Sequence, residues 1–192
     1  DVTLDDDIKK TLEHQSSIDF LPDVVILNAG GHNRDEREFD VNGYQQLYQV
    51  NCRGALVWVQ AYLKIFEENN SGHFVYISSL ASFYSFPFRA NYSASKAYTS
   101  MIFECLRKRY FNTKLNFSVF YPGLLKTDMS NQTPVPNFLK FPVTKAAKII
   151  LATLPKGDRS VRFPLRSLIL EWVLATIPNP ILLRLVNKKY QR

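Results

Sequence analysis

Cysteine is scarce in this chain of 192 residues, which contains only Cys52 and Cys105. Two cysteines provide no disulfide framework and no metal-binding spacing, so we expect a reducing, cytoplasmic setting. The three histidines, His14, His32 and His73, are scattered without a second potential ligand at a metal-binding interval. The sequence therefore predicts no metal site.

The chain also lacks a long uninterrupted apolar segment. Its most apolar stretch, residues 167–186, is interrupted by Glu171, Pro178, Pro180 and Arg184, so we do not expect it to cross a bilayer. The N-terminus, DVTLDDDIKK, is acidic and polar and does not have the pattern of a secretory signal. Basic residues do not alternate with aromatic ones as in nucleic-acid platforms, so no nucleic-acid partner is expected.

The charge is unevenly distributed, although its total of +7 is modest. Residues 1–96 contain 8 Lys and Arg against 13 Asp and Glu, whereas residues 97–192 contain 16 against 4. A basic half of this kind fits a solvated helical surface, an anionic ligand or a membrane surface. The length and the 46% hydrophobic content predict one globular domain over residues 1–192.

Short apolar runs alternate with helical patterns along the chain. Buried strands are predicted at residues 23–30, 73–79, 115–123 and 160–164, and helices at residues 4–16, 43–68, 94–111 and 144–154. The first helix is predicted to begin with a capping box formed by Thr3 and Asp6. This order predicts an α/β fold, namely a Rossmann-like, doubly wound parallel sheet in three α/β/α layers, with right-handed crossovers. Ligands of such sheets bind outside the carboxyl ends of the strands.

The last third of the chain is predicted to cover the ligand side. Residues 129–138 form a polar, proline-containing loop of the kind that closes over a site. Residues 155–192 form a C-terminal extension with apolar helical pieces at 165–177 and 181–190.

The segment NYSASKAY places Tyr92 and Lys96 one helical turn apart, so they share a helix face. A nearby ammonium favours the phenolate, and proton transfer at neutral pH requires the tyrosine pKa to fall by roughly 2 to 3 units. Ser79 ends the preceding strand, where its hydroxyl is placed to contact the same substrate oxygen. A second pair with this spacing, Tyr110 and Lys114, has no such serine, and we interpret it as surface residues.

The order of these motifs resembles that of the short-chain dehydrogenase/reductase family. The motifs shared are NAG at 28–30, Asn51 in the long helix, Ser79, Tyr92 with Lys96, and YPGLLKT at 121–127. The resemblance implies that Tyr92 is the general acid and base. It also implies that Lys96 lowers the Tyr92 pKa, that Ser79 orients the substrate oxygen, and that Asn51 holds a water linking Lys96 to solvent.

The same resemblance implies a dinucleotide cofactor, NAD or NADP, with NADP slightly favoured. The implied contacts are Asp1 and Val2 at the adenine, Asn28, Ala29 and Gly30 on the adenosine side, Tyr92 and Lys96 at the ribose of the nicotinamide, and Pro122, Gly123 and Thr127 around the nicotinamide. For Thr127, capping of the following turn is an equal alternative.

One family motif does not occur: the turn T-G-x-x-x-G-x-G, which holds the pyrophosphate. The seven glycines of this chain form no such cradle. In a family member the Asp-Val pair follows a β-α-β-α start of roughly 50 to 60 residues, so we expect that part to be missing here. The chain alone is then expected to bind dinucleotide weakly and to leave a strand edge unpaired.

The expected function is hydride transfer between NAD(P)(H) and a carbonyl or secondary alcohol of a small, apolar substrate. The alternative is a shortened, non-catalytic binding or scaffold module that retains the site residues. By resemblance, helices 43–68 and 94–111 are expected to form a homo-oligomer. Residues 165–192, which include Trp172, fit core packing, a subunit contact or peripheral membrane contact, so the expected location is the cytoplasm or a membrane surface.

Overall fold

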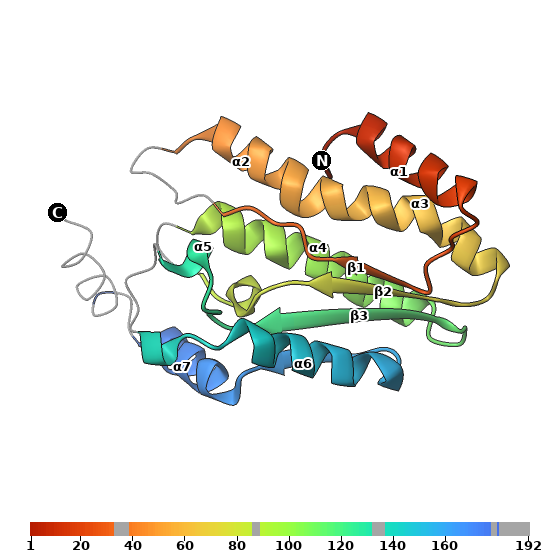
Figure 1. Cartoon of the computed structure of the whole chain (residues 1–192). Helices are drawn as coiled ribbons and strands as arrows, with labels where there is room; N and C mark the ends of the chain where they lie inside the picture. The colour runs from red at the N-terminus through yellow and green to blue at the C-terminus, as the bar shows by residue number, and fades with distance from the viewer. Residues whose placement is uncertain (33–38, 86–88, 132–136, 178–179, 181–192) are drawn as a thin grey trace.

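A parallel sheet of four strands forms the centre of the structure (Figure 1). The computed structural model describes residues 1–32, 39–85, 89–131, 137–177 and 180. The strands lie in the order β1 (Val24–Leu27), β2 (Gly72–Ile77), β3 (Leu115–Pro122) and β4 (Ser160–Phe163). All neighbouring strands are parallel, so their carboxyl ends meet at one edge of the sheet.

Helices precede, connect and follow the strands along the chain. They are α1 (Asp5–Ser17), α2 (Val41–Tyr48), α3 (Gly54–Glu68), α4 (Ala90–Arg109), α5 (Asp128–Asn131), α6 (Val143–Thr153) and α7 (Leu165–Thr176). A π-helical turn, Gln49–Arg53, joins α2 to α3, and short 3₁₀ turns cover Leu80–Phe83, Asn137–Leu139 and Leu154–Lys156. The predicted alternation of strands and helices is therefore confirmed over the described residues.

The sheet is apolar on both faces, which explains the three layers. One face forms a cluster with α3 and α4, composed of Phe66, Phe74, Tyr76, Phe103 and Phe117 together with further buried residues. The alternate residues Val75 and Phe120 pack with Ala146 of α6 on the opposite face. Figure 1 shows these helices on the two sides of the sheet. Because β2 and β3 are buried on both faces, most of their residues are apolar, and the polar His73 and Ser118 are buried with them.

The crossovers do not all have the same hand. The sheet order continues in one direction from β1 to β4, yet α3 and α4 cover one face and α6 covers the other. The connection from β3 through α6 to β4 therefore has the opposite hand to the connections before it, and the prediction of uniformly right-handed crossovers is wrong. The second apolar face explains the exception, because α6 is the helix that buries Val75 and Phe120.

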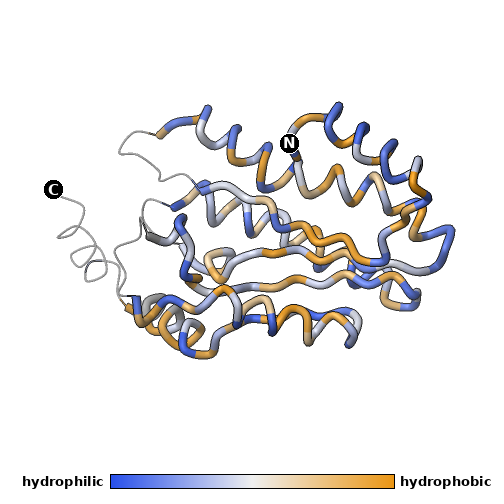
Figure 2. The backbone as a smooth tube through the Cα atoms, viewed as in Figure 1, coloured by the Kyte–Doolittle hydropathy of each residue, from blue (hydrophilic) through white to orange (hydrophobic). Residues whose placement is uncertain are grey.

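Strand β1 is less buried than the sequence predicted. Figure 2 shows it as an apolar segment, but among its residues only Leu27 is buried, and Val24 and Ile26 are 38% and 48% exposed. In the described part of the chain β1 pairs with β2 alone, so it forms an edge of the sheet. An apolar edge strand of this kind leaves a surface on which a further element can pack.

The start of α1 also differs from the prediction. Leu4, not Thr3, is the N-cap residue, and its side chain makes no capping hydrogen bond. The Thr3 hydroxyl donates to the Asp1 carboxylate at 2.8 Å, and Arg53 forms an ion pair with Asp5 at 2.7 Å. The capping box fails because Asp1 takes the Thr3 hydroxyl.

The C-terminal part is described as far as α7. Residues 165–176 of the predicted helix 165–177 form α7, whereas the predicted helix 181–190 and residues 132–136 of the predicted loop lie outside the described residues. In the part of the chain that the structure describes, no helix is both long and apolar enough to cross a membrane.

The buried His73 on β2 predicts a loss of stability in mild acid. Its Nε2 lies 2.8 Å from Ser118 Oγ, and burial lowers the His73 pKa below its ordinary value. Below about pH 6.5 the unfolded chain therefore binds a proton that the folded chain does not, so the free energy of unfolding should decrease as the pH falls. Urea unfolding at pH 7.5 and 5.5 measures this decrease, which should be smaller in His73→Gln. The exposed His14→Gln is the control, and an equal decrease in all three proteins would contradict the assignment.

Candidate active site

Tyr92 and Ser79 meet at the carboxyl end of β2. Helix α4 begins at Ala90, earlier than the predicted residue 94, so Tyr92 lies in its first turn. Ser79 follows β2 in an extended conformation and caps the next turn, with its Oγ accepting a hydrogen bond from the Ala81 amide at 3.2 Å. The Ser79 side chain also hydrogen-bonds the Tyr92 phenol. Two of the predicted catalytic residues are thus in direct contact.

The surroundings of the Tyr92 phenol favour its protonated form. Burial raises its pKa above the ordinary value, and the hydrogen bond with Ser79 and the positive charge of Arg89 oppose that rise only in part. From the sequence, Lys96 was expected to supply the opposing charge. Arg89, at the N-cap position of α4, is the cation whose charge acts on the phenol.

Lys96 is a buried cation one turn further along α4, with 4% of its surface exposed. Its Nζ donates to the Ile77 carbonyl oxygen at 2.9 Å and lies 5.1 Å from the centre of the Tyr76 ring. Burial lowers the Lys96 pKa to about 8. At neutral pH most of the molecules therefore keep the charge, yet the proton is held loosely enough to be exchanged.

Gly30 allows the Lys96 ammonium to reach this position. A Cβ atom at residue 30 would lie 3.1 Å from Lys96 Nζ and 3.4 Å from Asn51 Oδ1. A side chain at residue 30 would therefore require the Lys96 ammonium to move by a few tenths of an ångström. The glycine of the NAG motif is favoured by this close approach rather than by its backbone angles.

Asn51 connects three elements around the site. It lies in the π turn and is fully buried. Its Oδ1 accepts from the Gly31 amide at 2.7 Å, and its Nδ2 donates to the Gly31 carbonyl at 3.1 Å and to Ser95 Oγ at 2.9 Å. Its own carbonyl accepts from Thr99 Oγ1 at 3.2 Å. The loop after β1 is thereby fixed to the middle of the long helix and to α4.

The π turn itself was not predicted. The sequence predicted one continuous helix over residues 43–68. In the structure this segment consists of α2, the π turn and α3. Single π turns inside helices are frequent at functional sites. Here the turn holds Asn51 and Cys52, both of which hydrogen-bond to residue 95.

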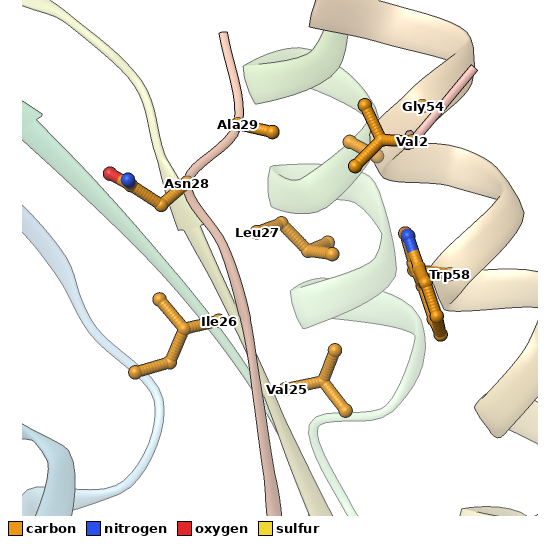
Figure 3. A pocket seen from close by; sticks show the side chains of 9 residues that line it. Val2, Val25, Ile26, Leu27, Asn28, Ala29, Gly54 and Trp58 are labelled. Atoms are coloured by element: carbon orange, nitrogen blue, oxygen red, sulfur yellow. The ribbon is translucent and has the colours of Figure 1, made fainter. Parts of the chain in front are cut away.

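Three predicted cofactor residues line one pocket beside β1 (Figure 3). Val2, Asn28 and Ala29 surround it together with Leu27 and Trp58. Figure 3 shows Leu27 pointing toward Trp58, whereas Asn28 points to the other side of the strand. The Asp1 carboxylate, in contrast, is engaged locally by the Thr3 amide and hydroxyl.

The remaining predicted residues lie near α5 and α7. Pro122 ends β3, and a Cβ atom at Gly123 would lie 2.4 Å from Ser167 Oγ of α7. The Thr127 hydroxyl accepts from the Ser130 amide at 3.3 Å. Thr127 therefore caps the turn of α5, which is the alternative that the sequence left open.

Sequence reasoning missed His32 and misjudged Tyr110. The ring of His32 lies 5.1 Å from that of Tyr92, and its only sequence signal was its place directly after the NAGG turn. Tyr110 was expected at the surface but is 7% exposed, because its ring stacks on Phe117 in the core and its hydroxyl donates to Glu67.

The buried contacts of Asn51 predict a large effect of its removal. Asn51→Ala leaves the Gly31 amide and carbonyl and the Ser95 hydroxyl without their partner, which should lower the free energy of unfolding by about 2 to 4 kcal/mol. Urea unfolding of the 192-residue chain measures the change. Asn112→Ala, at an exposed position, is the control and should change little. A loss below about 1 kcal/mol for Asn51→Ala would contradict the bridging role.

Known proteins share both sequence and fold with this chain. An uncharacterized oxidoreductase of Myxococcus xanthus is 30% identical over 162 residues, which cover 83% of this chain and 63% of that protein. Dehydrogenase/reductase SDR family member 7B of Mus musculus is 35% identical over 111 residues, which cover 56% and 34% of the two chains. The chain thus spans less than two thirds of the length of these relatives.

The fold has close counterparts among solved structures. A short chain dehydrogenase from Burkholderia cenocepacia, in complex with NADP, superposes with a TM-score of 0.74 at 24% identity, over 92% of this chain and 74% of that one. Residues 1–136 match the short chain dehydrogenase family. Since this match covers well over half of the sequence, the chain belongs to the short-chain dehydrogenase family.

Proposed function

We propose that this chain forms the catalytic part of an oxidoreductase that transfers a hydride between NAD or NADP and a carbonyl or secondary alcohol carbon. The observation that carries the proposal is the contact of Ser79 with Tyr92 beside the buried Lys96. A phenol and a serine hydroxyl directed at one point are suited to hold a substrate oxygen and exchange a proton with it.

The residues have distinct roles in the proposed reaction. Tyr92 gives a proton to the substrate oxygen during reduction and takes it back during oxidation, while Ser79 orients that oxygen. Lys96 remains a cation near neutral pH, since its pKa is about 8, and is suited to bind ribose hydroxyls. The Asn51 carbonyl, which accepts from Thr99, keeps a second lone pair for a water that connects Lys96 with solvent.

The chain fits the two ends of a dinucleotide but not the pyrophosphate between them. Tyr92 and Lys96 would hold the ribose of the nicotinamide, which supplies or accepts the hydride, and the pocket of Val2, Asn28 and Ala29 would hold the adenosine side. None of the seven glycines forms a pyrophosphate cradle. The exposed edge of β1 leaves room for strands that carry one. We therefore assign the activity to a form of the protein that includes this cradle.

The surroundings of the site favour an apolar substrate. We assign residues 129–138 and 155–192 to the substrate side, because Arg166 of α7 donates to the carbonyls of Phe138 and Lys140 at 3.1 and 2.9 Å. Phe138 and Leu165 are 73% and 71% exposed there. This combination favours a small carbonyl compound or alcohol with an apolar body.

The exposed surfaces and the cysteines support our proposals for partners and location. On α4, Tyr98 and Met101 are 45% and 66% exposed, which supports a homo-oligomer formed through α3 and α4. Cys52 and Cys105 are both unpaired, which fits the reducing cytoplasm. The exposed apolar side of α7 supports peripheral membrane contact through residues 165–192.

The test is hydride transfer by a form of the protein that carries the glycine-rich cradle. We expect oxidation of NADH or NADPH with an apolar ketone, with deuterium moving from carbon 4 of the nicotinamide to the substrate carbon. Tyr92→Phe should lower kcat about a hundredfold or more while dinucleotide binding persists. Tyr98→Phe, exposed on the same helix, is the control. If that form binds no dinucleotide, the scaffold alternative replaces the reductase.

A further inference from the structure

The exposed side of α7 is apolar, which is unusual for the solvent side of a helix. Its exposed apolar side chains are Leu165, Ile169, Leu170, Trp172 and Val173, with exposed fractions from 40% to 71%. Helices of soluble domains normally direct such a stripe toward the core and keep polar residues outside. The inward side of α7 carries Ser167, which is buried against Gly123, and Leu168, which packs against the core, so the apolar side chains of the exposed side are additional to those that α7 buries. Figure 2 shows the apolar colouring of this helix at the border of the molecule.

The surroundings of this apolar side are basic. Among the described side chains of α7, Arg166 is the only charged one, and its guanidinium donates to the carbonyls of Phe138 and Lys140. Arg162 is exposed less than one turn before α7, with its guanidinium carbon 3.8 Å from the centre of the Phe83 ring. In sequence, residues 137–177 contain seven Lys and Arg against two Asp and Glu. The surface therefore combines exposed apolar side chains with positive charge.

We propose that α7 docks on the surface of an anionic lipid bilayer, with Ile169 and Trp172 inserted among the headgroups and the neighbouring basic residues bound to lipid phosphates. Apolar area and positive charge are the two quantities that set the affinity of such surface helices. Tryptophan favours the interface between headgroups and acyl chains, because its ring is apolar and its N–H is polar.

A second copy of the chain is the competing occupant. In a two-fold contact through α7, Arg162 and Arg166 of each copy would face the same positive patch on the other, whereas anionic headgroups neutralise them. Charge complementarity therefore favours the bilayer. The docking does not depend on hydride transfer, but together with the proposed reaction it would supply apolar substrate directly from the lipid phase.

Vesicle flotation of the 192-residue chain tests the proposal. The chain should float with vesicles of phosphatidylcholine and phosphatidylserine, and binding should weaken with added salt and with phosphatidylcholine alone. Ile169→Glu should lower the bound fraction at limiting lipid about tenfold. Phe111→Glu, at a position 78% exposed just after α4, is the matched control and should bind as the unmodified chain does. Circular dichroism verifies that both variants are folded.

Tryptophan fluorescence provides a second readout that does not depend on the charge-reversal variant. Trp58→Phe leaves Trp172 as the only tryptophan, and its emission should shift to the blue on binding and be quenched by brominated lipids. Unchanged Trp172 emission with anionic vesicles, or flotation that Ile169→Glu does not reduce, would overturn the proposal. Self-association that Ile169→Glu abolishes, without any lipid binding, would overturn it in favour of a second copy.

Discussion

The burial of the Lys96 ammonium is the constraint on which the site depends. A cation removed from water is destabilised, and the fall of the Lys96 pKa from 10.5 to about 8 corresponds to roughly 3 kcal/mol for its charged form. The Ile77 carbonyl and the face of the Tyr76 ring compensate part of this loss. Both groups belong to β2 and lie within three residues of Ser79, so the strand that leads into Ser79 also holds Lys96.

This constraint explains several features that are otherwise unrelated. Glycine is favoured at residue 30, because a Cβ atom there would approach the ammonium to 3.1 Å. The loop after β1 must be held firmly, and Asn51 does so through its two hydrogen bonds to Gly31. The π turn orients Asn51 toward both that loop and Ser95 of α4. The NAG motif, the interrupted helix and the Tyr-Lys pair are thus parts of one arrangement.

Local sequence patterns were sufficient to predict most of the elements. β3 extends from Leu115 to Pro122, close to the predicted 115–123, because the sequence contains a mainly apolar segment that Pro122 and Gly123 stop. The continuous apolar run at residues 23–30 overestimated the burial of β1, because such a run does not show whether a strand lies at an edge. Neither the opposite hand of the α6 crossover nor the π turn has a local signal. Both result from tertiary packing, one over Val75 and Phe120 and the other around Asn51.

The sequence predicted which residues lie together in the candidate site. It predicted the charges that act on them less well. Motif order pointed to Ser79, Tyr92, Lys96 and Asn51, and the structure brings these four together. His32 was missed because its proximity to Tyr92 arises from folding and has no spacing rule. Arg89 lies only three residues before Tyr92, but the charge near the phenol was assigned to Lys96. The Tyr92 pKa is raised rather than lowered, since burial outweighs the favourable contacts of the described chain.

The pKa of Lys96 is the measurement that tests this account most directly. Heteronuclear NMR of chain labelled with ¹³C-lysine follows each Lys Cε signal with pH, and Lys96→Arg identifies the signal of residue 96. The account predicts a midpoint near pH 8 for Lys96, well below the ordinary lysine value near 10.5, because the group is buried between β2 and α4. A Lys96 midpoint near 10.5 would show an ammonium exposed to water and would contradict the arrangement of the site.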